Sequence, residues 1–265
     1  MRFRSLLAAL LALALLAGCS DDDDDGGAAS DDTAVDVGDD DTPEITADGG
    51  EEPAIDAELQ AAIETTQLEA EDLGEGWTLT GTKPAGEDAG DDAPNPLEDC
   101  VDDLGDRFDD AQLAETEERS FERQGEAPIP QQLTSSSVAL DDGALFTEMH
   151  GVLRDDAFGA CMATAFEQVM SETTPEGAEI TLGDIIQADT VVDPGDDADL
   201  ESTGIAIPVT VTAEGITLET SVSIMFISTG QVGASLLFFG PVTELGAEEQ
   251  AEFGRIVAER LSAAA

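Results

Sequence analysis

The chain of 265 residues has no tyrosine, one tryptophan, one lysine and one histidine. It has 9 lysine and arginine residues against 61 aspartate and glutamate residues, which gives a formal net charge of −52. Because nucleic acids bind to basic surfaces, this composition argues against nucleic acid as a partner. The shortage of aromatic side chains also argues against a carbohydrate-stacking cleft.

Recognisable catalytic motifs are missing as well. The single histidine, His150, stands near the end of an expected helix, and no Gly-x-Ser-x-Gly sequence accompanies it. We interpret His150 as a surface or capping residue rather than a member of a Ser-His-Asp set. Lys83 lacks the glycine spacing of a phosphate-binding loop. One histidine and two other cysteines do not supply the four ligands of structural zinc, so we expect no catalytic residue and no cofactor.

A long apolar run occurs only at the start of the chain. Arg2 and Arg4 precede an apolar segment at 6–16, and small residues then lead to Cys19. The segment is shorter than the about 20 residues that cross a bilayer, so we expect residues 1–18 to be a signal peptide. The sequence LAGC at 16–19 resembles the lipobox of bacterial lipoproteins, and this resemblance implies lipid attachment at Cys19. The alternative is an ordinary secretory signal.

Residues 19–52 are rich in Asp, Gly, Ala, Thr and Glu, and include five consecutive aspartates at 21–25. Such a segment cannot bury enough apolar surface to offset its ordering entropy, so it is expected to be a disordered acidic tether. Its carboxylates would be repelled by an anionic membrane surface. Residues 53–265 remain as one domain with a sizeable core.

The three cysteines have separate roles in this interpretation. With Cys19 carrying lipid, Cys100 and Cys161 are left in an oxidising extracytoplasmic compartment, where a disulfide is the default. The bridge would close a loop of about 60 residues and contribute about 3 to 4 kcal/mol by the chain-entropy model.

Hydrophobic periodicity predicts an α+β fold. Apolar side chains recur at helical spacing within 55–73, 97–108, 145–153, 158–169 and 244–261. Strand-like patterns cover 113–123, 134–140, 180–186, 204–211, 216–227 and 231–239, the last three separated by short turns. We therefore expect a central antiparallel sheet with a C-terminal meander, covered by helices and clamped by one disulfide between two of them. Trp77 is expected in the core.

One acidic loop is a weak calcium candidate. Its carboxylates are Asp193, Asp196, Asp197, Asp199 and Glu201. Calcium takes six to eight oxygen ligands, but the EF-hand pattern fails because Ser202 stands at the glycine position and Pro208 at the bidentate glutamate position. The favoured interpretation is a solvated acidic loop, with no metal site.

The order of these features resembles a known family. The chain resembles actinobacterial sensor-type lipoproteins in the order of four segments and in its two cysteines. The segments are DLGEGWTL, DDAFGACMATAFEQV, DPGDDADLEST and EEQAEFGRIVAERL. Those proteins are similar to the extracellular sensor domains of mycobacterial serine/threonine kinases. The resemblance implies a central antiparallel sheet with a ligand groove, and it names no ligand.

We therefore expect a lipoprotein on the extracytoplasmic face of the cell membrane that acts as a non-catalytic ligand-binding or sensor-type module. Its partners would be the membrane, through Cys19, and an unknown small ligand or envelope protein. The alternatives are a structural or assembly factor for an envelope protein and a carboxylate-dependent secreted hydrolase. The excess of acidic residues has three possible explanations: adaptation to a saline habitat, the base composition of the genome, or a cationic ligand.

Overall fold

The structure is a computed structural model of the whole chain. It describes residues 57–84, 100–101, 103–173, 178–188, 190–193, 199–213, 215–242, 244 and 246–265, without the side chains of 169–173. The expected signal peptide, Cys19 and the acidic tether lie outside these residues. Among the residues described, no helix is both long and apolar enough to cross a membrane.

The described residues form six helices and nine strands. The helices are α2 (Ala57–Glu64), α3 (Ala70–Leu73), α4 (Leu104–Asp110), α5 (Ala144–Arg154), α6 (Asp156–Thr173) and α7 (Ala247–Ala264). The strands are β1 (Thr78–Lys83), β2 (Gln112–Glu115), β3 (Glu118–Arg123), β4 (Gln131–Leu140), β5 (Ala178–Leu182), β6 (Ile186–Ala188), β7 (Glu201–Ala213), β8 (Ile216–Thr229) and β9 (Val232–Pro241).

All nine strands belong to one antiparallel sheet in the order β1-β3-β4-β9-β8-β7-β5, with β2 also paired to β4 and β6 to β7. The expected meander is confirmed in β7, β8 and β9. Its hairpins turn through Gly215 and Gly230, whose φ angles of 82° and 56° are left-handed and favour glycine. The large antiparallel sheet, its helices and one disulfide confirm the expected α+β class.

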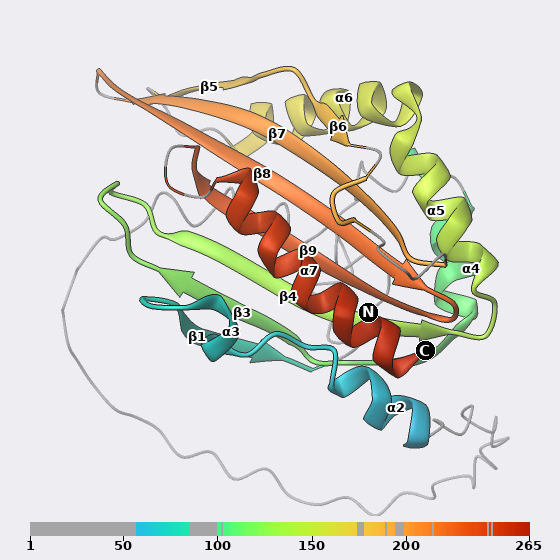
Figure 1. Cartoon of the computed structure of the whole chain (residues 1–265). Helices are drawn as coiled ribbons and strands as arrows, with labels where there is room; N and C mark the ends of the chain where they lie inside the picture. Colours follow the sequence, from blue (N-terminus) through green and yellow to red (C-terminus); the bar gives the residue numbers. More distant parts are fainter. Residues whose placement is uncertain are drawn as a thin grey trace, which may run out of the picture.

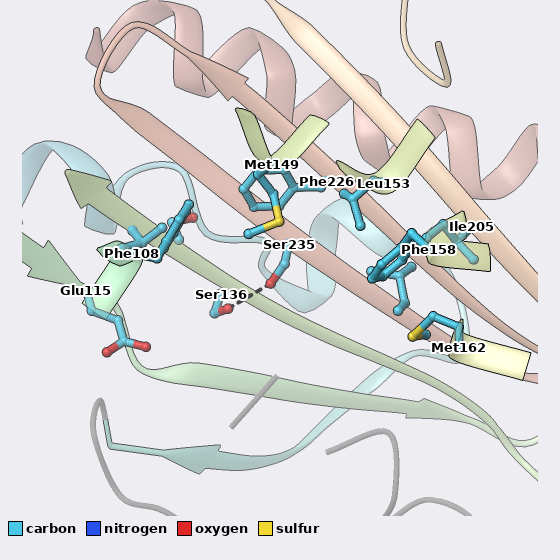
Figure 2. Close-up of a pocket in the computed structure, with 13 residues that line it drawn as sticks. Phe108, Glu115, Ser136, Met149, Leu153, Phe158, Met162, Ile205, Phe226 and Ser235 are labelled. Carbon is cyan, nitrogen blue, oxygen red and sulfur yellow. Dashed lines mark hydrogen bonds between the residues drawn. The ribbon is translucent and has the colours of Figure 1, made fainter. Parts of the chain in front are cut away.

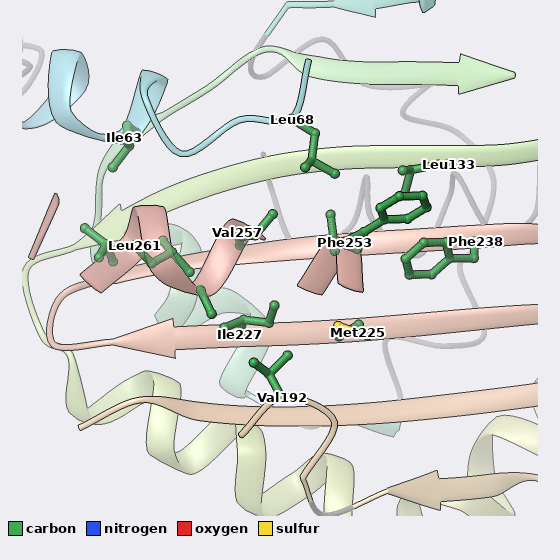
Figure 3. Close-up of a cluster of buried hydrophobic side chains, with 14 of the residues drawn as sticks. Ile63, Leu68, Leu133, Val192, Met225, Ile227, Phe238, Phe253, Val257 and Leu261 are labelled. Carbon is green, nitrogen blue, oxygen red and sulfur yellow. The ribbon is translucent and has the colours of Figure 1, made fainter. Parts of the chain in front are cut away.

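Helices pack on both faces of this sheet (Figure 1). On one face, α7 lies across the central strands with α2 and α3 beside it, and we call this the α7 face. Its core includes Leu133, Met225 and Phe238 from the sheet and Phe253 and Leu261 from α7 (Figure 3). On the opposite face, α4, α5 and α6 cover β7, β8 and β9 through two further apolar clusters. We call this second face the cavity face.

Arg123 joins three elements on the α7 face. Its guanidinium lies 4.8 Å from the centroid of the Trp77 ring and donates two hydrogen bonds of 2.6 and 2.8 Å to the Glu249 carboxylate on α7. Trp77 is buried, which confirms the expectation, and its ring meets Phe253 edge-on at 6.1 Å. A bidentate, stacked arginine fixes the position of α7 over β3.

Two expectations were wrong in detail. The region predicted as one strand at 113–123 is divided into β2 and β3, which lie end to end along β4. The division occurs because the Thr116 hydroxyl accepts a hydrogen bond from Ser137 N–H and the carbonyl of Glu117 turns to the Gln67 side chain. Cys100 was expected inside a helix, but it precedes α4, which begins at Leu104.

Candidate functional site

A cavity of about 60 Å³ lies between the cavity face of the sheet and helices α4, α5 and α6 (Figure 2). Its walls are mostly apolar and include two methionines and three phenylalanines. The lining residues are Phe108, Glu115, Ser136, Ser137, Val138, Met149, Leu153, Phe158, Met162, Ile205, Ile224, Phe226 and Ser235. A site of this kind, apolar with few polar groups, is typical of small-molecule binding.

Helical periodicity explains which residues of α5 and α6 line the cavity. Met149 and Leu153 are four residues apart on α5, and Phe158 and Met162 are four apart on α6, so each pair lies on one side of its helix. Phe108 comes from α4. These stripes were predicted as core-facing, which is correct for most of their residues, but the sequence did not indicate that they enclose a space.

Strand alternation explains which residues of the sheet line the cavity, and we call this side the floor. Along β4, β9 and β8, the cavity face carries Ser136, Ser235 and Phe226 in one row, because these residues are successive partners across the sheet. The hydroxyl oxygens of Ser136 and Ser235 lie 3.0 Å apart in a hydrogen bond. The sheet side of the cavity therefore carries a hydroxyl pair, and Ser137 and Glu115 are its other polar lining residues.

Two glutamates lie on the cavity face of the sheet, and one of them lines the cavity. Glu115 at the end of β2 is only 8% exposed, lines the cavity and accepts a 3.0 Å hydrogen bond from Gln112. The pairing of Arg119 with Ser135 places the neighbouring Glu118 on the cavity face of β3. Burial raises the pKa of Glu118, and Lys83, its partner on β1, counteracts part of that rise. No sequence pattern distinguishes these two glutamates from the other acidic residues among the 61 in the chain.

The disulfide lies next to the cavity. Cys100 and Cys161 are bonded, with Cα atoms 5.6 Å apart and a sequence separation of 61, as expected from the cysteine count. Cys161 is on α6 between Phe158 and Met162, and Cys100 packs against the same apolar cluster. The bridge ties α6 to the segment that leads into α4, so it holds two walls of the cavity together.

His150 is buried, and the prediction of a surface or capping residue was wrong. Its Nδ1 lies 2.7 Å from the Thr203 hydroxyl and its Nε2 2.9 Å from the Ser228 hydroxyl, and its ring packs 5.2 Å from Phe226. Two hydroxyls on neighbouring strands compensate for burying an imidazole. Burial, with a smaller contribution from the Arg154 charge, lowers the pKa of His150 to about 4.

This histidine supports the cavity rather than reacting in it. Thr203 and Ser228 are both buried, so neither hydroxyl is presented to a substrate. Phe226, which lines the cavity, is packed between His150 and the rings of Phe108 and Phe146. The neutral imidazole thus positions an aromatic wall.

The acidic loop at 193–201 is only partly described. Asp196 and Asp197 lie outside the described residues, while Asp193 and Asp199 are exposed. Glu201 is half-buried, with a carboxylate oxygen 3.9 Å from Arg154 Nη1. Across the described part of the chain, no three metal-ligating side chains cluster together. A cation at this loop would have to compete with Arg154 for Glu201.

Comparisons with solved structures find a likeness in fold. No family model matches the chain, and no curated protein matches it. Among solved structures, the chain is similar to the extracellular domain of PknH from Mycobacterium tuberculosis, with 8% sequence identity and a TM-score of 0.39. The match covers 76% of this chain and 95% of that one.

Proposed function

We propose that this protein is a lipid-anchored extracytoplasmic module that binds a small ligand, without catalysis, in the cavity between the sheet and α4, α5 and α6. The observation that carries the proposal is the cavity itself, whose lining is mostly apolar and includes one hydrogen-bonded hydroxyl pair. Sites that bind small molecules combine such walls with few polar groups.

The location is supported by chemistry at two places in the chain. The disulfide between Cys100 and Cys161 is typical of an oxidising compartment. The LAGC sequence ending at Cys19 resembles a lipobox and accounts for retention at the membrane. Changing Cys19 to Ser should release the protein from the membrane fraction or stall its processing, and unchanged retention of a processed protein would contradict the anchor.

A non-catalytic role is supported by the position of the single histidine. Its imidazole is enclosed by Thr203, Ser228 and Phe226, so it cannot act as a general base on a bound ligand. This removes hydrolysis by a histidine-activated nucleophile from the candidate functions.

Ligand binding can be tested with N-phenyl-1-naphthylamine, a neutral probe that fluoresces in apolar surroundings. The purified protein should show saturable binding at one site. Ile224→Phe should abolish it by filling the cavity, since Ile224 lines the cavity on β8. Val211→Phe is the matched control, because Val211 packs in the same apolar cluster away from the cavity. Equal binding by both variants would contradict the proposal.

A second candidate, an assembly factor for an envelope protein, is favoured by one observation. Ile216 opens β8 at the tip of the β7–β8 hairpin and is 68% exposed. Exposed Val242 lies nearby, since its N–H donates to the Glu219 carbonyl. If crosslinking captured one stoichiometric protein and Ile216→Asp abolished the capture, while small-molecule probes failed to bind, this function would replace ligand binding.

A further inference from the structure

We infer that the cavity holds its ligand in one orientation, with a hydrocarbon end between α6 and β7 and the rest of the ligand toward β2 and β4. The ligand class is an amphiphile whose alkyl or aryl end carries no polar atom. This inference rests on the proposed function and concerns the same site. It follows from the size of the cavity and from the uneven distribution of polar residues around it.

The size of the cavity limits how much of a ligand it can enclose. A volume of about 60 Å³ is several times the roughly 10–15 Å³ that one water needs. It is smaller than the roughly 300–1,000 Å³ of sites that enclose whole drug-sized molecules. The cavity therefore fits the end of an alkyl chain or a small ring, and the remainder of the ligand lies outside it.

The polar lining residues all lie on one side of the cavity. Across its floor, the sheet runs from β2, paired with β4, through β9 and β8 to β7. The polar residues come from the first three of these strands, and they are Glu115 on β2, Ser136 and Ser137 on β4, and Ser235 on β9. The lining residues of β8, β7 and α6 are all apolar. The cavity thus has a polar end at β2 and β4 and an apolar end at β7 and α6.

The apolar end is formed by contacts between α6 and β7. Phe158 and Met162 of α6 belong to the same apolar cluster as Ile205 of β7, and Figure 2 shows these three side chains together, away from Glu115. Met162 is fully buried, and its flexible side chain can adapt to different apolar shapes. A hydrocarbon group placed here contacts apolar side chains alone. A hydroxyl or ammonium group would lose its water without gaining a side-chain partner.

The residues of the polar end are already engaged within the protein. The Ser136 hydroxyl is hydrogen-bonded to that of Ser235, and the Glu115 carboxylate accepts from Gln112. Ser136 and Glu115 also have further interactions. These residues therefore need no hydrogen bond from a ligand, and we assign them no selection among head groups. They affect orientation, because an alkyl end gains less beside a carboxylate and hydroxyls than among apolar side chains.

The first test locates the two ends of a bound ligand in the wild-type protein. 1,2-Decanediol has both hydroxyl groups at one end and a methyl group at the other. With ¹³C-labelled methionine methyl groups, the methyl end of the diol should give nuclear Overhauser effects to the Cε methyl of Met162, and the carbinol protons should give none. Met225 is the control, because it packs in the core of the α7 face and should show no contact with the ligand.

Two outcomes of this experiment would overturn the inference. One is contact between the carbinol protons and the Met162 methyl group, and the other is no contact to Met162 from either end of the diol. The conservative variants Met162→Leu and Met225→Leu assign the two methyl signals.

The second test compares two isomers as competitors of bound N-phenyl-1-naphthylamine. 1,10-Decanediol carries a hydroxyl group at each end, so it must bury one of them in the cavity. 1,2-Decanediol should displace the probe at a concentration at least about tenfold lower. Displacement by 1,10-decanediol at equal or lower concentration would overturn the inference and leave the proposed function intact. Absence of probe binding to the wild-type protein would overturn both.

Discussion

His150 Nε2 on α5 lies 2.9 Å from the hydroxyl of Ser228 on β8, inside a fully buried environment. This bond joins the helix that supplies Met149 to the strand that supplies Phe226, and both of these residues line the cavity. Because burial lowers the pKa of His150 to about 4, the imidazole is neutral in the folded protein at neutral pH.

The first prediction concerns pH. An unfolded histidine titrates near 6.5 and His150 in the folded protein near 4, so between these values the unfolded chain binds more protons. The free energy of unfolding should fall as pH drops from about 6.5 to 4, by at most about 3 kcal/mol from this residue. Urea unfolding at several pH values measures it. His150→Gln should lose this component and retain the contribution of the carboxylates, and identical pH slopes in both proteins would contradict the assignment.

The second prediction concerns the attachment of α7. Arg123→Lys should lower the free energy of unfolding by about 1 to 2 kcal/mol, because lysine cannot form the two bonds to Glu249 and stacks less well on Trp77. Arg255→Lys is the control, since Arg255 pairs only within α7, with Glu252 and Glu259 at the surface. Urea denaturation of the two variants should separate them clearly, and equal effects would count against a special role for Arg123.

The third prediction concerns the disulfide. Titration of the unfolded, unreduced protein with a thiol reagent should find no free thiol at Cys100 or Cys161. Replacing both by alanine should lower the free energy of unfolding by about 4 kcal/mol on the chain-entropy model. The replacement should also weaken probe binding, because the bridge holds two walls of the cavity. Two reactive thiols in the wild-type protein would refute the clamp.

The fourth prediction concerns the close approach of α5 to the sheet. A Cβ atom at Gly233 would lie 2.6 Å from the Phe146 ring, so Gly233→Ala should destabilise the protein by about 1 to 3 kcal/mol through overpacking. Gly81→Ala on β1 is the matched control, since a Cβ there meets nothing within 4 Å. Thermal melting compares the two, and a neutral Gly233→Ala would show that Phe146 moves aside without cost.

Much of the fold follows from local pattern. Runs rich in Val, Ile and Thr, separated by short turns, predicted the meander, and the structure places glycines with positive φ at 215 and 230. Apolar stripes predicted α5, α6 and α7. These features depend on neighbouring residues, which periodicity can detect.

The errors concern interactions between distant parts of the chain. The break between β2 and β3 depends on Thr116 reaching Ser137, 21 residues away. The burial of His150 depends on Thr203 and Ser228, 53 and 78 residues away. In the sequence, His150 directly follows Met149 of the apolar stripe of α5. Helical spacing cannot predict that hydroxyl groups on two strands lie within hydrogen-bond distance of both ring nitrogens.

The cavity was the least predictable feature. Three consecutive serines at 135–137 of β4 are the one sign in the sequence that this part of the sheet carries hydroxyl groups. Their meaning required β9, because Ser136 acquires its partner only when Ser235 is brought beside it. A cavity between helices and a sheet depends on how distant segments pack together, and hydrophobic periodicity does not report this packing.

The placement of α2 on the α7 face has a consequence for attachment. The described chain begins at Ala57 in α2. Arg260 of α7 donates a hydrogen bond to the carbonyl of Gln67, between α2 and α3, and pairs with Asp72 on α3, so this part of the chain is held against the C-terminal helix. The cavity opens on the other side of the sheet. Ala57, where the described chain begins, and the cavity therefore lie on opposite faces of the sheet.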